Sequence, residues 1–190
     1  MNLPNLLTMI RIALIPVFMF FALADVPFFG LIALVIFIIA SITDHIDGHL
    51  ARKYNLITNF GKIMDPLADK LLVTSAFLVF VAQGRMSCVP VMIILAREFA
   101  VTSLRVVAAG EGKVLAAGMS GKVKTVSQIV YIILMLLNLG SLTFIPVVNL
   151  LCPFAYIIEQ IAIWIITAIT LYSGIEYFYT NRAIVLSSIK

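Results

Sequence analysis

Four aspartates lie close together in the sequence and could do chemistry as a group. Asp44, Asp47, Asp65 and Asp69 fall within 26 residues of a 190-residue chain that has only nine acidic residues. At 3.6 residues per turn, the first two share one face of a helix, and the last two lie about one turn apart on another helix. The connection between these helices is short, so they are expected to be antiparallel neighbours. All four carboxylates could then point into one pocket.

Four carboxylates in one pocket repel one another strongly. Two unit charges 4 Å apart repel by about 4 kcal/mol at an effective dielectric constant of 20. The group must therefore take up protons or hold cations, and hard oxygen ligands favour magnesium, manganese or calcium over zinc. Two divalent cations would neutralise four aspartates, and paired metal ions are also what in-line phosphoryl displacement uses.

The pattern of the acidic cluster leaves other interpretations open. The carboxylates could line an aqueous interface or pair with lysines without catalysing a reaction. They could also form a path for protons or cations in a transporter, although these acids are not repeated in inverted order elsewhere in the chain. A regulatory or scaffolding membrane protein is a third class, but the sequence has no feature that favours it.

The composition places these residues in a membrane protein. Hydrophobic residues make up 63% of the chain and charged residues 12%, and the mean hydropathy is +1.14. Soluble domains are about half apolar and a quarter charged. These values exclude a water-soluble globular domain, a disordered chain and a coiled coil. Cys88 and Cys152 lie in apolar surroundings, so neither a disulfide framework nor a cysteine-based metal site is expected.

Uncharged stretches predict six transmembrane helices, because a crossing needs about 20 mostly apolar residues. We expect the helices near residues 4–24, 29–53, 61–83, 87–109, 121–139 and 153–179. The uncharged run 125–158 must be divided, because a single helix of that length would be about 51 Å long. Asn138, Pro146 and Pro153 act as helix breakers there. The expected fold class is an all-α integral membrane protein in which residues 1–190 form one domain.

The basic residues predict the orientation of these helices. With the N- and C-termini both cytosolic, nine of the 13 lysines and arginines fall in cytosolic segments, and only Arg85 falls in an outside loop. Arg11 lies within the first helix, where snorkelling to the interface is one interpretation. The acidic pocket is expected at the cytosolic side of the bundle, since Asp44 lies about 12 Å along its helix from Arg52.

The spacing of the acidic cluster resembles the signature of the CDP-alcohol phosphotransferase family. The chain reads Asp44-x2-Asp47-Gly48-x2-Ala51-Arg52-x8-Gly61-x3-Asp65-x3-Asp69, which matches that signature at all eight defined positions. The resemblance implies a membrane enzyme of phospholipid biosynthesis. Such an enzyme transfers the phosphatidyl group of a CDP-activated lipid to an alcohol and releases CMP.

The resemblance also implies roles for individual residues. Asp44, Asp47, Asp65 and Asp69 would ligate two divalent cations, Mg²⁺ or Mn²⁺. Asp69 would in addition be the catalytic base that takes the proton of the acceptor hydroxyl. The residues that would bind the CDP-lipid are Asn5, Thr8, Gly48, Ala51, Arg52 and Gly61.

Shorter motifs resemble the family members that use glycerol 3-phosphate as the acceptor. They are Pro4-Asn5-x2-Thr8-x2-Arg11, Arg97-Glu98-Phe99 and Gly121-Lys122-x-Lys124-Thr125. The donor would then be CDP-diacylglycerol and the product phosphatidylglycerophosphate. Phosphatidylglycerol, serine or an inositol phosphate remain alternative acceptors.

An anionic acceptor requires cations, and four are available to bind its phosphate: Arg97, Arg105, Lys122 and Lys124. The two arginines lie within about 80° of each other on their helix. The two lysines open a helix whose N-terminus itself favours anions. Two alternatives stay open: the lysines could be positive-inside anchors, and Arg97 could pair with neighbouring helices.

The resemblance further implies where the protein works and with what. We expect a multi-pass protein of the bacterial cell (inner) membrane, embedded in the lipid bilayer, with its active site facing the cytoplasm. A homodimer is expected, and no nucleic acid partner.

Overall fold

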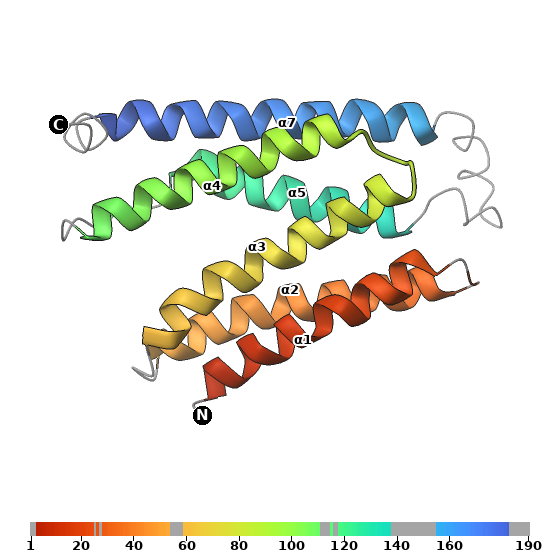
Figure 1. Cartoon of the computed structure of the whole chain (residues 1–190), viewed down its shortest axis with the longest axis horizontal. Helices are drawn as coiled ribbons and strands as arrows, with labels where there is room; N and C mark the ends of the chain where they lie inside the picture. Colours follow the sequence, from red (N-terminus) through yellow and green to blue (C-terminus); the bar gives the residue numbers. More distant parts are fainter. Residues whose placement is uncertain are drawn as a thin grey trace. The chain divides into compact units, whose positions relative to one another are not determined.

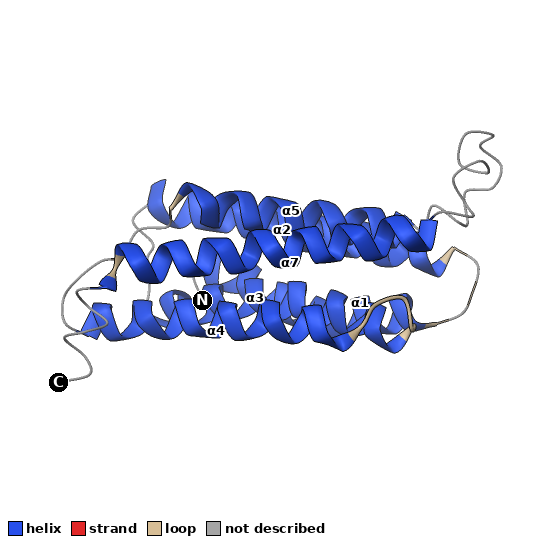
Figure 2. Cartoon of the chain, turned by 90° about the horizontal axis from the view of Figure 1, so that it is seen from above, coloured by secondary structure: helices blue, strands red, loops and turns tan. Residues whose placement is uncertain are grey.

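The part of the chain that the computed structural model describes is all-helical. It comprises residues 3–24, 26, 28–53, 59–110, 115, 118–137 and 155–182, and within these the side chains of residues 3, 4, 44–53, 59, 60, 62, 63, 66 and 155 are not described. Figure 2 shows helices and short loop segments in this part of the chain. The helices are α1 (Leu3–Leu23), α2 (Phe29–Lys53), α3 (Asn59–Ala82), α4 (Cys88–Gly110), α5 (Met119–Leu137) and α7 (Ala155–Thr180).

Each of these six helices begins and ends within two residues of an expected one. The all-α fold class is therefore confirmed for the described residues. Contacts between Cα atoms divide the chain into two units. The first unit comprises residues 1–86 and 132–153, and the second comprises residues 87–131 and 154–190.

In the first unit, α1 packs against both α2 and α3 (Figure 1). One stripe of α1 is buried, with side chains three or four residues apart, as expected for a helix with a single inward face. The stripe consists of Thr8, Arg11, Ile15, Phe18 and Ala22. Arg11 is completely buried, so the snorkelling interpretation is wrong and its guanidinium lies inside this unit.

Small residues on the facing helices allow close packing. Ala33 and Ala40 of α2 and Ala68 of α3 are completely buried, and alanine lets helix backbones approach one another in a membrane protein. Phe18 of α1 and Phe37 of α2 fill the remaining space, with ring centroids 5.8 Å apart. α1 therefore packs closely against α2 and α3 in the first unit.

The end of α3 is closed by a Schellman motif. The N–H of Arg85 donates to the carbonyl of Phe80 across 3.0 Å, and the N–H of Gly84 donates to the carbonyl of Val81. Gly84 has a φ of +69°, a left-handed conformation that glycine adopts without steric cost. Beyond this turn, the Arg85 guanidinium donates to the carbonyl of Met135 near the end of α5, which satisfies a terminal carbonyl group.

In the second unit, α4 packs against α7. Val101 and Leu104 of α4 and Tyr177 of α7 form a buried apolar cluster, against which Leu115 and Phe178 pack. The first part of α5 is joined to α7 by polar contacts. One of them is a hydrogen bond between the buried side chains of Gln128 and Thr170.

Three of the described helices are long and apolar enough to cross a membrane: Asn5–Leu23, Met119–Leu137 and Tyr156–Thr180. A shorter apolar stretch, Phe29–Thr43, begins α2. Large apolar side chains also cover the outside of the helices, for example Phe20 at 65% and Ile175 at 69% exposure. Such surfaces suit lipid and not water, so the protein is a membrane protein.

Candidate active site

The end of α2 carries half of the acidic signature. α2 continues without a break to Lys53, so its aspartates lie on one continuous helix as expected. The side chains of this segment lie outside the described residues. The expectations for Asp44, Asp47, Gly48, Ala51 and Arg52 therefore stay predictions.

The start of α3 carries the other half of the signature. Asp65 and Asp69 are both half-buried and lie about one turn apart, and Gly61, one turn earlier, is buried. α2 and α3 contact each other within the first unit. This contact is consistent with the expectation that the two acidic segments lie on neighbouring helices.

α1 adds a polar contact to this region. The hydroxyl of Thr8, which is completely buried, donates to Oδ1 of Asp65 across 2.6 Å. Asn5, one turn earlier on α1, is half-buried. Thr8 was expected to bind the CDP-lipid, and the structure gives it a direct contact with an expected metal ligand.

The side chains at this site suit a hard divalent cation. Asp65 and Asp69 offer only carboxylate oxygens, the donors that Mg²⁺ and Mn²⁺ prefer. The hydroxyl of Thr8 contacts one of the two oxygens of Asp65, Oδ1. No group of three histidine, cysteine, aspartate or glutamate side chains occurs among the described ones, which do not include those of Asp44 and Asp47.

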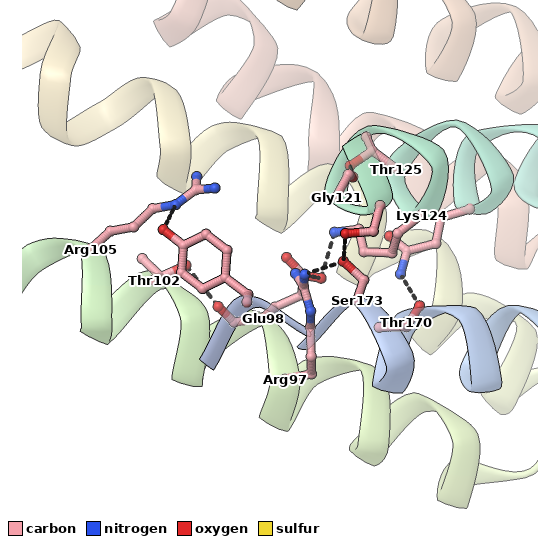
Figure 3. Close-up of polar contacts among 12 residues, drawn as sticks. Arg97, Glu98, Thr102, Arg105, Gly121, Lys124, Thr125, Thr170 and Ser173 are labelled. Carbon is pink, nitrogen blue, oxygen red and sulfur yellow. Dashed lines mark hydrogen bonds and ion pairs between the residues drawn. The ribbon is translucent and has the colours of Figure 1, made fainter. Parts of the chain in front are cut away.

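The second unit contains a buried ionic cluster that joins α4, α5 and α7 (Figure 3). Nη1 of Arg97 lies 3.1 Å and Nζ of Lys124 lies 2.5 Å from the same carboxylate oxygen, Oε1 of Glu98. Nη2 of Arg97 donates to the hydroxyl of Ser173 across 2.8 Å. Arg97 therefore pairs within its own helix and with α7, which is the alternative that the sequence left open for it.

Arg105 lies two turns after Arg97 on α4 and is exposed. Its Nε donates to the hydroxyl of Tyr177 across 3.0 Å, and its guanidinium carbon lies 5.2 Å from the centroid of that ring. The hydroxyl and the ring of Tyr177 thus both contact the guanidinium of Arg105, although the residue as a whole stays exposed.

The two lysines at the start of α5 differ sharply. Lys124 is 6% exposed and belongs to the ionic cluster, whereas Lys122 is exposed. Residues two apart on a helix point about 200° apart, so the two side chains leave α5 in different directions. Lys122 and Lys124 therefore lie in different surroundings, although the sequence suggested the same two interpretations for both.

Sequence reasoning gave four residues of the second unit no place in the candidate site: Glu98, Ser173, Gly174 and Tyr177. Glu98 belongs to a motif that the sequence singled out, and its negative charge next to Arg97 was a usable signal. Ser173, Gly174 and Tyr177 gave no such signal, because serine, glycine and tyrosine are ordinary residues in transmembrane helices.

A sequence profile of the CDP-alcohol phosphatidyltransferase family matches residues 1–172. The chain belongs to this family, which confirms the resemblance inferred from the acidic signature. It is therefore a membrane-embedded transferase of phospholipid biosynthesis. The family generally uses divalent metal ions.

Named relatives show which members of the family this chain is similar to. The chain is 45% identical to the CDP-diacylglycerol–glycerol-3-phosphate 3-phosphatidyltransferase of Bacillus subtilis (strain 168), over 95% of both chains. It is 36% identical to the enzyme of the same name from Escherichia coli (strain K12), over 96% of both chains. It is also 39% identical to a probable phosphatidylglycerophosphate synthase of Mycobacterium tuberculosis (strain H37Rv), over 74% of this chain and 68% of the relative.

Proposed function

We propose that this enzyme transfers the phosphatidyl group of CDP-diacylglycerol to sn-glycerol 3-phosphate. The acceptor hydroxyl oxygen forms a bond to the phosphatidyl phosphorus, the bond from that phosphorus to CMP breaks, and phosphatidylglycerophosphate results. One observation carries the proposal: the 45% identity, over 95% of both chains, to a relative whose name states this reaction.

The four aspartates of the signature are assigned to two divalent cations, Mg²⁺ or Mn²⁺. The assigned ligands are Asp44, Asp47, Asp65 and Asp69. When bound, the cations would neutralise the diphosphate of the donor and stabilise the charge on departing CMP. The hydroxyl of Thr8 on Asp65 supports this assignment, because it fixes the orientation of one carboxylate.

Asp69 is assigned as the general base. Its carboxylate would take the proton of the acceptor hydroxyl as that oxygen attacks phosphorus. A base must lie within hydrogen-bond reach of the proton that it removes. The half-buried position of Asp69, about one turn from Asp65 on α3, supports this role.

Residues around the aspartates are assigned to the CDP-lipid. Gly48 and Ala51 leave space for the cytidine, and Arg52 steadies a phosphate. Thr8 acts on the donor through the carboxylate of Asp65, which its hydroxyl contacts. The full set is Asn5, Thr8, Gly48, Ala51, Arg52 and Gly61.

The basic residues of the second unit are assigned to the acceptor's phosphate: Arg97, Arg105, Lys122 and Lys124. Charge-assisted hydrogen bonds to phosphate are about twice as strong as neutral ones. Buried Arg97 and Lys124, held at one carboxylate, support a site with fixed geometry. Exposed Lys122 and Arg105 support a site that an acceptor dissolved in water can reach.

We assign the topology as six crossings by one domain of residues 1–190, with both termini and the active site on the cytoplasmic side. The excess of lysine and arginine in the segments assigned to the cytosol supports this orientation. The enzyme would lie in the bacterial inner membrane as a homodimer. These assignments agree with the water-soluble nature of the nucleotide and the acceptor.

The test uses the full-length protein, purified in mixed micelles that contain CDP-diacylglycerol. Glycerol 3-phosphate, phosphatidylglycerol, serine and inositol phosphate are supplied separately, and the products are identified by mass spectrometry. We expect phosphatidylglycerophosphate and CMP with glycerol 3-phosphate, no turnover after chelation, and recovery with Mg²⁺ or Mn²⁺. Faster turnover with another acceptor, or full turnover after exhaustive chelation, would contradict the proposal.

A further inference from the structure

One carboxylate oxygen in the second unit holds two cations. Nη1 of Arg97 and Nζ of Lys124 both lie within hydrogen-bond distance of Oε1 of Glu98. The side chains of Arg97 and Lys124 are each 8% exposed, and that of Glu98 is 16% exposed. Like charges repel strongly away from water, so the shared carboxylate is what allows the two cations to converge.

Arg97 is also fixed from α7. Its Nη2 donates to the hydroxyl of Ser173, which is 1% exposed. The next residue, Gly174, is buried, and a Cβ atom there would lie 2.8 Å from Cγ of Arg97 and 3.4 Å from its Nε. Cγ is the inner part of the arginine stem, so any larger residue at this position must displace the whole side chain. The arginine therefore needs the bare backbone of Gly174.

The fixed arginine keeps one buried donor available. Among the described residues, Nε of Arg97 has no hydrogen-bond partner. Buried donors are nearly always satisfied, and one without a partner points to a group that binds there. An acceptor oxygen of an anion would satisfy Nε.

We propose that Glu98 and Gly174 are positioning residues for the acceptor's phosphate, an inference that rests on the proposed function. Glu98 holds Arg97 and Lys124 at one point by its charge, and Gly174 keeps the arginine stem in place by its lack of a side chain. Neither residue touches the substrate. Ser173 and Gly174 lie beyond residues 1–172, which the family profile matches.

Substitution of the two residues tests different parts of the proposal. Glu98→Gln keeps the size of the side chain but removes its charge, so the two cations repel and separate. Gly174→Ala keeps every charge but pushes Arg97 aside. Each change removes preorganisation of the phosphate site, which weakens binding of the acceptor.

The experiment measures KM for glycerol 3-phosphate and for CDP-diacylglycerol with purified variants in mixed micelles. Glu98→Gln and Gly174→Ala should each raise KM for glycerol 3-phosphate about tenfold, with KM for the lipid within about twofold of wild type. Glu98→Asp keeps the charge and should recover part of the loss. The matched control is Gly30→Ala in α2, where the nearest atom to an added Cβ is 4.0 Å away; it should behave like wild type.

Different results separate the inference from the proposed function. If wild type makes phosphatidylglycerophosphate but Glu98→Gln keeps or lowers KM for glycerol 3-phosphate, Glu98 does not position the cations. If Gly174→Ala matches Gly30→Ala, the role of Gly174 is excluded. If wild type itself does not use glycerol 3-phosphate, the proposed function fails instead. Size-exclusion chromatography identifies misfolded variants. If Glu98→Gln does not fold, Glu98→Asp tests Glu98 instead, because its shorter side chain should still raise KM for glycerol 3-phosphate, and a KM equal to that of wild type excludes the role of Glu98.

Discussion

The hydroxyl of Thr8 on α1 donates to Oδ1 of Asp65 on α3 across 2.6 Å, and Thr8 is completely buried. This contact links the first helix to the acidic signature. A carboxylate that accepts such a bond is fixed in rotation, so its other oxygen is aimed in one direction. Hydrogen bonds to metal ligands commonly have this effect, and their loss costs about 10- to 100-fold in metal affinity or activity.

We predict that Thr8→Val raises the Mg²⁺ concentration needed for half-maximal activity about tenfold. Valine has nearly the same shape as threonine but cannot donate a hydrogen bond to Asp65. The measurement is an activity titration with Mg²⁺, together with calorimetric titration of Mg²⁺ into the protein without substrate. Thr8→Ser keeps the hydroxyl and should stay near wild type. Equal Mg²⁺ affinity in the valine and serine variants would exclude this role.

Asp69→Asn should lower kcat by about 100-fold or more while binding of CDP-diacylglycerol persists, because general base catalysis contributes about 10²- to 10⁴-fold. Asparagine retains the shape of aspartate but cannot accept the proton. The measurement combines kcat with binding of the lipid donor. Glu176→Gln, at an exposed acid on α7, controls for loss of negative charge. A kcat within threefold of wild type would remove Asp69 from the mechanism.

Lys122→Ala and Arg97→Ala should both weaken binding of glycerol 3-phosphate, but only Arg97→Ala should also lower the stability of the protein. Both should raise KM for glycerol 3-phosphate about tenfold, since each removes a charged hydrogen bond to phosphate. Lys122 is exposed, so its loss should leave thermal unfolding in detergent within about 0.5 kcal/mol of wild type. Arg97 is buried beside Glu98, so its loss should cost about 1–3 kcal/mol of stability. If Lys122 is only a positive-inside anchor, Lys122→Ala will leave KM unchanged.

The bounds of the helices could be predicted from the sequence because charges and helix breakers lie at their ends. The expected helix at 29–53 coincides with α2, and the division of the run 125–158 places the end of α5 within two residues of its position. The acidic signature was also accessible, because its members lie within two consecutive helices. Local patterns of this kind can be recognised in the sequence without knowledge of the tertiary contacts.

The contacts of the lysine and arginine side chains could not be predicted, because they depend on residues far apart in the chain. Periodicity shows that Lys122 and Lys124 point in different directions, but it does not show which of them faces inward. The contact of Arg97 with Gly174 joins α4 to α7, and a glycine among apolar residues has no pattern that reveals its neighbour. Arg11 likewise could have been at the interface or in the interior until its surroundings were known.

The proposed topology predicts that membrane-impermeant cysteine reagents reach Cys88 from outside the cell. Cys88 is an exposed residue at the start of α4. With both termini in the cytosol, Cys88 follows an outside loop, whereas Lys122 lies on the cytosolic side. A membrane-impermeant maleimide applied to intact cells or spheroplasts should therefore label Cys88 in a Cys152→Ser background. It should label Lys122→Cys in a Cys88→Ser, Cys152→Ser background only after the membrane is permeabilised. The opposite labelling pattern would invert the topology and place the lysine-rich start of α5 outside the cell, contrary to the trend of the positive-inside rule.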